Sequence, residues 1–558
     1  MKKLTEETKG LLLSLIKNQN FDKIEKLLLS LDEVEKNKPF LLNLLGVSKL
    51  TKKALNKEEA IKEATEAQDL FRNAYHKDNL FFDALYNLAE TSLKTSNYEN
   101  VLVLLEGHLK KVSYDFKTVF LLAKINFRLG NIEQSINYYE KIIKNNNATP
   151  AVWKNLIFIS NYSSQFSQKK YLNLCKRYTS TIKKIEKKNF KNFTYKKNIK
   201  KKKIGFFSVD FKEHAVMNFL TETIKMLNLN NFETIAFNLT EPNSNDSKTE
   251  QLKELFTDWH NIHGLDDIKI VNLIRDNRIN ILFDLVGYTS GSKMELFKYR
   301  SAPNQISWIG YTNSTGLDEM DYIVTDPNVI EVEENYSEKF LQLPDIWNCH
   351  SPIKQKIEIE DLPALKNGYI TFGSFNNYAK ISDETIEIWC DLLLKLKSKL
   401  ILKTSDEKFK SWENILLSKF EKRGVNPKNI KFLKRTKSFD DHLKCYNKID
   451  IALDTFPYNG ATTSFESIWM GVPVLTIKGK NFKSRYGYSI NKNLNMDRFI
   501  AIDKKDFINK GILNSSDLKK LNELRKKLRN MALKSPLFDT QRFNKSFLKV
   551  LNELIEKQ

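Results

Sequence analysis

One segment of the sequence joins an apolar run to a helical pattern through a turn. Residues 454–473 (DTFPYNGATTSFESIWMGVP) have a Pro/Asn/Gly turn, and the helical pattern opens at Thr462 and Thr463. Free N–H groups, two hydroxyls and the helix dipole at such a start favour an anion, so the pair is a candidate phosphate site. Glu466, one turn later, is a candidate acceptor for ribose hydroxyls. The alternative is that Thr462 only caps the helix, with Glu466 as its capping-box partner.

Two other residues stand near expected strands of the same region. Residues 369–381 (YITFGSFNNYAKI) indicate a strand that ends in a Gly/Ser/Asn loop, with Lys380 just before the next helix start. An ammonium there can neutralise a departing diphosphate as a point charge. In a lysine-rich chain, an incidental surface lysine is the alternative. His442 precedes the strand that leads to Asp454, and a lone histidine is more often structural than functional.

His214 lies in the loop after the first expected strand of the α/β region, within SVDFKEHAV. That loop is the crossover position of a doubly wound sheet, so His214 is a candidate active-site residue. Asp210 in the same loop is either a general base or a helix cap. Residues 286–316 are rich in Gly and aromatic side chains, as in loops that line sites and in loops that only turn corners.

Sequence signatures of several enzyme classes are absent. The chain has no GxxxxGK[ST], GxSxG or HExxH motif, and no DxD pair placed to hold a metal-bound diphosphate. This disfavours an NTPase, an α/β-hydrolase, a zincin and a metal-dependent glycosyltransferase. The four cysteines are scattered without a CxxC pair, which indicates neither a disulfide framework nor a zinc site.

The candidate residues need parallel strands to position them, and the second half of the chain supplies two series. Short apolar runs alternate with helical patterns such as 216–227 and 268–277, which predicts parallel sheets covered on both faces. The expected strands are 204–209, 234–237, 281–285, 305–308, 322–324 and 340–343, then 369–375, 399–402, 430–432, 449–453 and 474–476. We therefore expect two Rossmann-like lobes with a ligand cleft between them.

The first part of the chain contains an internal repeat. Residues 82–115 and 116–149 align at an offset of 34, each as two amphipathic segments around a polar turn, and Ala89 matches Ala123. This resembles the tetratricopeptide repeat, whose arrays present a concave surface to a peptide or protein. A degenerate unit at 41–79, a half-unit at 21–31 and a helix from near Ala151 extend the pattern. An unspecialised helical bundle is the alternative.

Composition and charge limit the class of protein. The chain of 558 residues is 41% hydrophobic and 28% charged, as in ordinary globular proteins. It has no apolar run of the ~18 residues that span a bilayer and no secretory signal, so we expect a cytoplasmic protein. Residues 169–203 carry +14 of the net charge of +22. We interpret them as a solvated linker with no specific nucleic-acid partner, and a polyanion or membrane-surface contact is the alternative.

Together these patterns predict five regions. They are a repeat domain (1–165), a basic helical linker (166–203), a first lobe on the acceptor side (204–345), a nucleotide-sugar-binding lobe (346–534) and a C-terminal helix (535–558).

The segments resemble, in order, the family of the protein O-linked N-acetylglucosamine transferases and the SPINDLY proteins (glycosyltransferase family 41). The matching stretches are SVDFKEHAV, residues 287–316, MDYIVTD, FGSFNNYAKI, LDTFPYNGATTSFESIWMGVPV and SPLFD. The resemblance implies a GT-B fold and an inverting, metal-independent transfer of N-acetylglucosamine from UDP-GlcNAc to Ser or Thr hydroxyls of proteins. The partners implied are a nucleotide sugar and a protein or peptide acceptor held partly by the repeats, with no cofactor beyond the donor.

The resemblance also implies roles for residues of the second lobe. Lys380 matches the lysine that stabilises the departing diphosphate, and Asn377 stands where a glutamine is frequent. Thr462 and Thr463 match the pair at the phosphate-binding helix. Glu466 falls at the acidic ribose-binding position.

Two histidines match family positions as well. His442 matches the histidine beside the base and ribose, and His214 matches a cleft histidine whose chemistry is disputed. Ala461, Cys445 and Ala379 depart from the animal transferases, which carry His, Arg and Tyr there, and bring the chain closer to bacterial and SPINDLY-type members. Alternative functions are therefore protein O-fucosyl transfer from GDP-fucose, transfer to glycan or lipid-linked acceptors, and a non-catalytic scaffold with a degenerate transferase lobe.

Overall fold

The computed structural model describes residues 4–51, 57–98, 100–182, 201–355, 357–403 and 410–556. The chain divides into two compact units. The first contains the residues up to Val152 and a short segment that ends at Leu416, and the second contains the rest from Trp153 onward. Among the helices of the described ranges, none is both long and apolar enough to cross a membrane.

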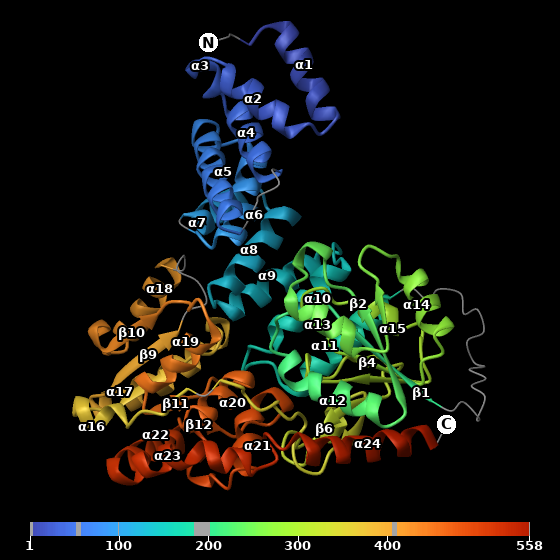
Figure 1. The fold of residues 1–558 in the computed structure, drawn as a ribbon. Coiled ribbons are helices and arrows are strands. Elements are labelled where there is room, and N and C mark those ends of the chain that lie inside the picture. Colours follow the sequence, from blue (N-terminus) through green and yellow to red (C-terminus); the bar gives the residue numbers. More distant parts are fainter. Residues whose placement is uncertain are drawn as a thin grey trace. The chain divides into compact units, whose positions relative to one another are not determined.

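The first unit is built from pairs of helices, labelled in Figure 1. The pairs expected from the offset of 34 are α6 (Phe82–Thr95) with α7 (Val101–Lys111), and α8 (Phe116–Arg128) with α9 (Ile132–Lys144). Ahead of them lie α1 (Glu6–Lys17), α2 (Phe21–Ser30), α3 (Glu33–Lys36), α4 (Pro39–Thr51) and α5 (Lys57–Lys77). Ala89 and Ala123 are fully buried, and the Ser135 hydroxyl donates to the Ala123 carbonyl at 2.7 Å. Small side chains thus let paired helices approach closely, as a tetratricopeptide-like array requires.

The second unit begins with α10 (Pro150–Ser160), most of which belongs to it, and α11 (Gln168–Thr181), followed by a first lobe. The lobe is a seven-stranded parallel sheet in the order β3-β2-β1-β4-β5-β6-β7. Its strands are β1 (Lys202–Ser208), β2 (Phe232–Asn238), β3 (Asp258–Asn261), β4 (Ile281–Asp284), β5 (Asn304–Ser307), β6 (Tyr322–Thr325) and β7 (Lys339–Gln342). The helices between them are α12 (Met217–Leu229), α13 (Ser247–Leu255), α14 (Asp267–Asp276) and α15 (Met294–Phe297). The strand order reverses between β1 and β4, so the loop with His214 leaves the sheet at its switch point.

The second lobe repeats this plan with six parallel strands in the order β10-β9-β8-β11-β12-β13. They are β8 (Thr371–Ser374), β9 (Lys399–Lys403), β10 (Ile430–Leu433), β11 (Ile451–Leu453), β12 (Val474–Ile477) and β13 (Ile500–Ala501). The helices are α16 (Pro363–Asn367), α17 (Asp383–Leu396), α18 (Lys410–Glu421), α19 (Phe439–Lys444), α20 (Thr462–Trp469), α21 (Tyr486–Lys492), α22 (Lys504–Ser515) and α23 (Leu518–Leu533). The order reverses between β8 and β11, which are paired with Ile451 opposite Phe372. The loops after these two strands carry Lys380 and residues 454–461, so both lie at the ligand-binding edge.

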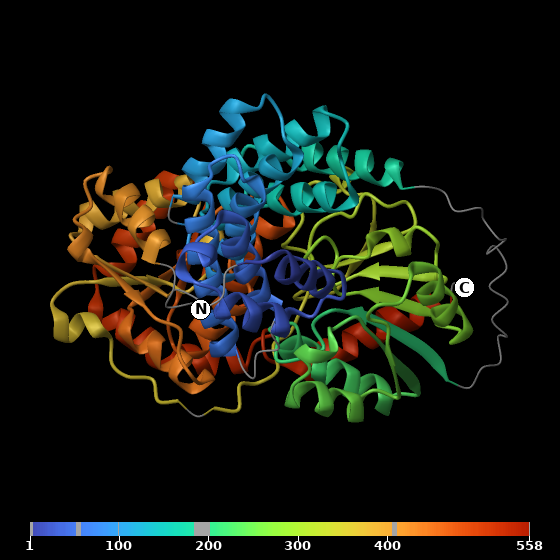
Figure 2. The same ribbon diagram turned by 90° about the horizontal axis from the view of Figure 1, so that it is seen from above.

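The last helix crosses back to the first lobe. α24 (Thr540–Glu556), the red helix of Figures 1 and 2, lies along the lobe drawn in green. Phe547 is fully buried, with its ring 5.7 Å from Phe283 of β4 and 4.8 Å from Trp308. The C-terminal helix therefore contributes to the core of the first lobe.

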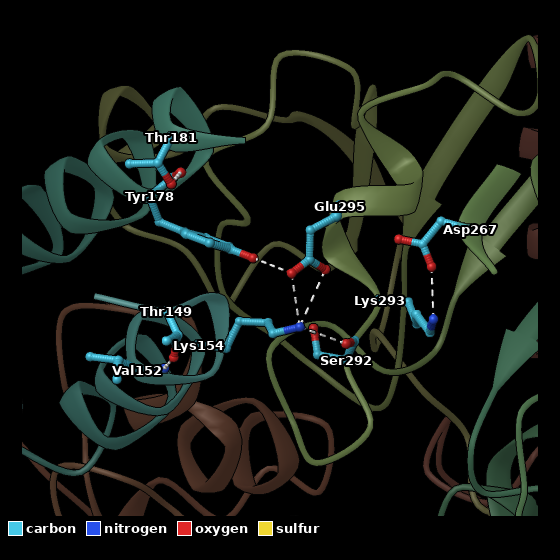
Figure 3. Close-up of polar contacts among 9 residues, drawn as sticks. All are labelled: Thr149, Val152, Lys154, Tyr178, Thr181, Asp267, Ser292, Lys293 and Glu295. Atoms are coloured by element: carbon cyan, nitrogen blue, oxygen red, sulfur yellow. Dashed lines mark hydrogen bonds and ion pairs between the residues drawn. The ribbon is translucent and has the colours of Figure 1, made fainter. Parts of the chain in front are cut away.

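Helices α10 and α11 also pack against the first lobe. The Lys154 ammonium of α10 donates to the Ser292 carbonyl at 2.9 Å and lies 3.0 Å from the Glu295 carboxylate, as Figure 3 shows. Tyr178 of α11 donates its hydroxyl to the same carboxylate at 2.5 Å. The first compact unit thus ends earlier than the expected repeat boundary at 165, and α11, in the expected linker, packs on the lobe. Residues 183–200 of that linker lie outside the described residues.

Two strands were not among the sequence predictions. β3 reads DWHN, has no buried residue and forms one edge of its sheet, and β13 has only two residues. Short edge strands lack the apolar run on which the prediction depends. The other eleven strands are the predicted ones, with shifts of up to two residues at their ends.

Candidate active site

Lys380 lies in a short 3-10 turn, Tyr378–Lys380, that follows β8. Its ammonium donates to the backbone carbonyl of Asn459 at 2.8 Å and lies 4.1 Å from the centroid of the Tyr458 ring. Asn459 and Tyr458 belong to the loop that follows β11. The two loops at the switch point of the second lobe are therefore joined through the Lys380 side chain.

Burial sets the electrostatics of this site. It lowers the pKa of Lys380 to about 8, and the nearby Asp454 carboxylate opposes this effect. Burial also raises the pKa of Asp454 to about 6, against hydrogen bonds from the Gly460 N–H at 2.7 Å and the Thr476 hydroxyl at 2.7 Å. At neutral pH Lys380 is thus mainly an ammonium ion, and it lies in surroundings that solvate the ion poorly.

Helix α20 begins without a capping side chain. Its N-cap is Ala461, which has no side chain able to accept a hydrogen bond, so the proposed capping box of Thr462 and Glu466 does not form. The Thr463 hydroxyl donates instead to Asn376 Oδ1 at 2.9 Å. The first-turn N–H groups of the helix therefore remain available to an anion.

A glycine allows this close approach between the two loops. A Cβ atom on Gly460 would lie 2.6 Å from Asn376 Oδ1 and 2.6 Å from the Thr463 hydroxyl oxygen. Both neighbours belong to short, hydrogen-bonded side chains, so a larger residue would displace the contact between them.

Glu466 and His442 meet in a polar cluster behind the helix start. His442 Nε2 lies 3.0 Å from Glu466 Oε2, and the buried Tyr446 hydroxyl donates to the same oxygen at 3.1 Å. The Lys403 ammonium contacts His442 Nδ1. A lysine donor at Nδ1 leaves the imidazole proton on Nε2, where it faces the carboxylate. Burial lowers the pKa of Lys403.

Asn377 is exposed, and its side chain accepts a hydrogen bond from the Ala379 N–H at 3.0 Å. It thereby caps the turn that carries Lys380. The neighbouring Asn376, which the sequence analysis did not single out, is the asparagine in contact with Thr463.

His214 lies apart from the residues of the second lobe. Its side chain is 43% exposed, and its Nδ1 lies 3.6 Å from the Asp210 carboxylate. Burial raises the pKa of Asp210, and the His214 charge opposes this effect.

A cavity of about 560 Å³ extends along the first lobe close to His214. It is bounded by α12, α13, residues 350–355 and Phe439, and it includes Glu213, the neighbour of His214. Phe439 is in α19, one turn before His442. The cavity therefore connects the loop of His214 to the helix of His442.

The structure thus brings Lys380, Thr463, Glu466 and His442 to one edge of the second lobe. Tyr446 connects the parts, because its hydroxyl also lies 3.2 Å from the Thr463 carbonyl. Sequence reasoning missed Asn376, Asp454, Tyr446, Lys403 and Tyr458 as members of the site. The position of Asp454 at the end of a predicted strand was a usable signal, whereas the others depend on contacts between separate loops.

The arrangement suits a ligand that carries a diphosphate and a nucleoside. An ammonium and a helix start can hold phosphate oxygens, and a carboxylate beside an imidazole can hold ribose hydroxyls and a base. Among the described residues, no group of three or more His, Cys, Asp or Glu side chains is placed to hold a metal ion.

The chain was compared with known proteins. It matches the family described as Glycosyl transferase family 41 over residues 156–357 and 350–547. A probable UDP-N-acetylglucosamine–peptide N-acetylglucosaminyltransferase SPINDLY of Petunia hybrida is 32% identical over 350 residues, which are 62% of this chain and 37% of that protein. The probable transferase SEC of Arabidopsis thaliana is 26% identical over 363 residues, which are 62% of this chain and 36% of that protein. The chain thus matches little more than a third of the length of these curated relatives.

Among solved structures, a mutant of the O-GlcNAc transferase of Thermobaculum terrenum resembles this chain with a TM-score of 0.77. The match covers 89% of this chain and 95% of that one, at 23% sequence identity. This likeness shows the fold, a helical region followed by two Rossmann-like lobes in the GT-B arrangement.

Proposed function

Because the chain belongs to glycosyl transferase family 41, we propose that it moves N-acetylglucosamine from UDP-GlcNAc to Ser or Thr hydroxyls of a protein or peptide. The transfer inverts the anomeric centre and needs no metal ion. One observation carries the proposal: the Lys380 ammonium and the uncapped start of α20 lie at the same edge of the sheet, joined by Asn459 and the 454–461 loop. The relatives whose names specify a UDP-N-acetylglucosamine donor and a peptide acceptor support it.

Lys380 and the start of α20 act on the leaving group. As the bond between the sugar and the diphosphate breaks, negative charge develops on the diphosphate oxygens. The ammonium and the N–H groups of Thr462 and Thr463 stabilise this charge, and the partly dry surroundings strengthen the interaction. A lysine with a pKa of about 8 is charged at neutral pH, and a bound diphosphate raises that pKa further.

Glu466 and His442 recognise the nucleoside part of the donor. The Glu466 carboxylate accepts hydrogen bonds from ribose hydroxyls, and the His442 ring packs against the ribose and base. Tyr446 and Lys403 hold the two side chains in place. The side chain of Cys445, where animal transferases carry an arginine, is buried and donates to the Asp441 carbonyl at 3.2 Å. It leaves the edge of the base without a charged contact.

The acceptor enters from the side of the first lobe. The cavity between α12, α13 and Phe439 receives part of the acceptor chain, near His214. The helical repeats bind other parts of the acceptor. His214 and Asp210 lie where they can contact the acceptor hydroxyl, and we assign the proton transfer to neither.

The experiment is a donor panel measured first by thermal shift and then by transfer. UDP, UDP-GlcNAc, GDP and GDP-fucose are added with and without EDTA, since a ligand at about 100 times its Kd stabilises a protein by ~2.7 kcal/mol. We expect a shift with the uridine compounds that EDTA leaves unchanged, and a Ser/Thr peptide that gains one N-acetylhexosamine by mass spectrometry. A shift with guanosine compounds alone overturns the donor in favour of fucose, and no shift with any compound overturns the enzyme assignment.

A further inference from the structure

We infer that the turn between α10 and α11, residues 161–167, is part of the catalytic site, because it holds the Tyr458 ring against Lys380. Tyr162 and Tyr458 are then positioning residues for that lysine. We call residues 161–167 the elbow. The inference rests on the proposed function, in which Lys380 stabilises the departing diphosphate.

Tyr458 is the aromatic neighbour of the Lys380 ammonium, which lies 4.1 Å from its ring centroid. A ring face attracts a cation most strongly where water is largely excluded. Asp454 is the charged group that acts on Lys380, and it lies in the same loop as Tyr458. The position of this loop therefore determines both the direction and the charge of the ammonium.

Tyr162 of the elbow packs edge-on against Tyr458. The ring centroids are 4.9 Å apart with an interplanar angle of 60°, and Tyr162 is buried. Tyr486 of α21 also contacts Tyr458, with centroids 6.2 Å apart, and its hydroxyl meets Thr312 of the first lobe. Tyr458 is thus held between a ring from the elbow and a ring from its own lobe.

A second link joins the elbow region to the loop of Lys380. The buried Lys483 ammonium lies 3.5 Å from the Ser160 carbonyl, at the end of α10. The Lys483 backbone carbonyl accepts the Asn459 N–H at 2.9 Å, and the Asn459 carbonyl in turn accepts Lys380. Both links end at the two residues that contact the Lys380 ammonium.

The elbow can act as a support only if it is itself fixed, and it is fixed to the first lobe. Asn161 donates to the Tyr311 hydroxyl at 3.0 Å and accepts from Asn313 at 2.8 Å. On either side of the elbow, Lys154 and Tyr178 contact the Glu295 carboxylate, as Figure 3 shows. The elbow therefore relates the position of Lys380 in the second lobe to the loops of the first lobe.

The experiment follows the titration of Lys380 in the full chain. Pulse reductive methylation at a series of pH values, followed by peptide mass spectrometry, reports the charge state of Lys380, with the exposed Lys395 as internal reference. We expect Tyr458→Leu to lower the Lys380 pKa by about 1 unit and kcat by ~10-fold, with the donor KM unchanged. Tyr458→Phe keeps the ring and is expected to behave as the wild type.

The role of the elbow is tested by a double-variant cycle. Tyr162→Leu is expected to shift the Lys380 titration in the same direction by a smaller amount, and to add nothing when Tyr458 is already Leu. Phe166→Leu is the matched control, because Phe166 is a buried elbow residue whose ring contacts Lys170 and not Tyr458. It is expected to leave the Lys380 titration unchanged.

Two outcomes overturn the inference. One is a wild-type Lys380 titration in folded Tyr458→Leu protein, and the other is an equal effect of Tyr162→Leu with and without the Tyr458 ring. Failure of the proposed function is seen separately, as absence of transfer by the wild type, because the methylation experiment needs no turnover. If Tyr458→Leu does not fold, the Tyr162 and Phe166 variants still decide between the two possibilities.

Discussion

Replacing Lys380 by methionine should separate stability from activity. Methionine fills similar space without a charge, so it removes the interaction with the departing diphosphate and also the cost of burying an ammonium. The proposed mechanism requires the first, and the lowered pKa of Lys380 implies the second.

The structure gives the size of both effects. A fall in pKa from 10.5 to about 8 corresponds to about 3 kcal/mol of unfavourable burial at neutral pH. Loss of the hydrogen bond to the Asn459 carbonyl costs about 1–3 kcal/mol in return. We therefore expect Lys380→Met to be as stable as the wild type, or more stable by up to about 2 kcal/mol. Loss of a charged donor to the leaving group should lower kcat about 100- to 1,000-fold.

The stability difference should depend on pH in a defined direction. The Lys380 pKa in the folded state lies below its value in the unfolded chain. The burial cost is therefore complete below pH 8 and fades as pH rises from about 8 to 10.5, where both states lose the proton. The advantage of Lys380→Met should be largest at neutral pH and should shrink over that interval.

Two measurements check this reasoning. Urea unfolding at pH 7 and at pH 9.5 gives the stability difference, and sugar transfer to peptide gives kcat. Lys395→Met is the matched control, because Lys395 is exposed on α17, and it should alter neither. A folded Lys380→Met protein with kcat near that of the wild type would refute the assignment of Lys380, and a loss of several kcal/mol at neutral pH would refute the burial argument.

Three further outcomes follow from the same contacts. The kcat/KM of the wild type should fall as pH rises through about 8, as Lys380 loses its proton, and a profile flat to pH 10 would contradict this. Glu466→Ala should weaken UDP binding about 10- to 100-fold by calorimetry, and an unchanged Kd would remove Glu466 from the nucleoside site. Glu295→Ala should cost about 2 kcal/mol of stability without changing donor affinity, because it leaves Lys154 mostly buried and without its carboxylate. The exposed Glu250→Ala is its control, expected within ~0.5 kcal/mol of the wild type in urea unfolding.

Local patterns in the sequence determined much of the fold. The offset of 34 gave the pairs α6–α7 and α8–α9, because each amphipathic segment carries its own helical period. Apolar runs gave eleven of the thirteen strands, and the reversal of strand order places Lys380 and the 454–461 loop at one edge. The candidates Lys380, Thr463 and Glu466 were recognisable because each stands at a fixed offset from the end of a strand or the start of a helix.

Only the tertiary structure decided what surrounds these residues. The Lys380 side chain reaches a carbonyl 79 residues away, and Tyr162 and Tyr458 meet although they belong to opposite ends of the α/β unit. Neither Tyr458 nor Asn376 has a local pattern that distinguishes it from other loop residues. Periodicity reports which face of an element is buried, but not which other element covers it. Burial of the Lys380 ammonium, and with it the lowered pKa, is a property of the packed loops and so had no counterpart in the sequence.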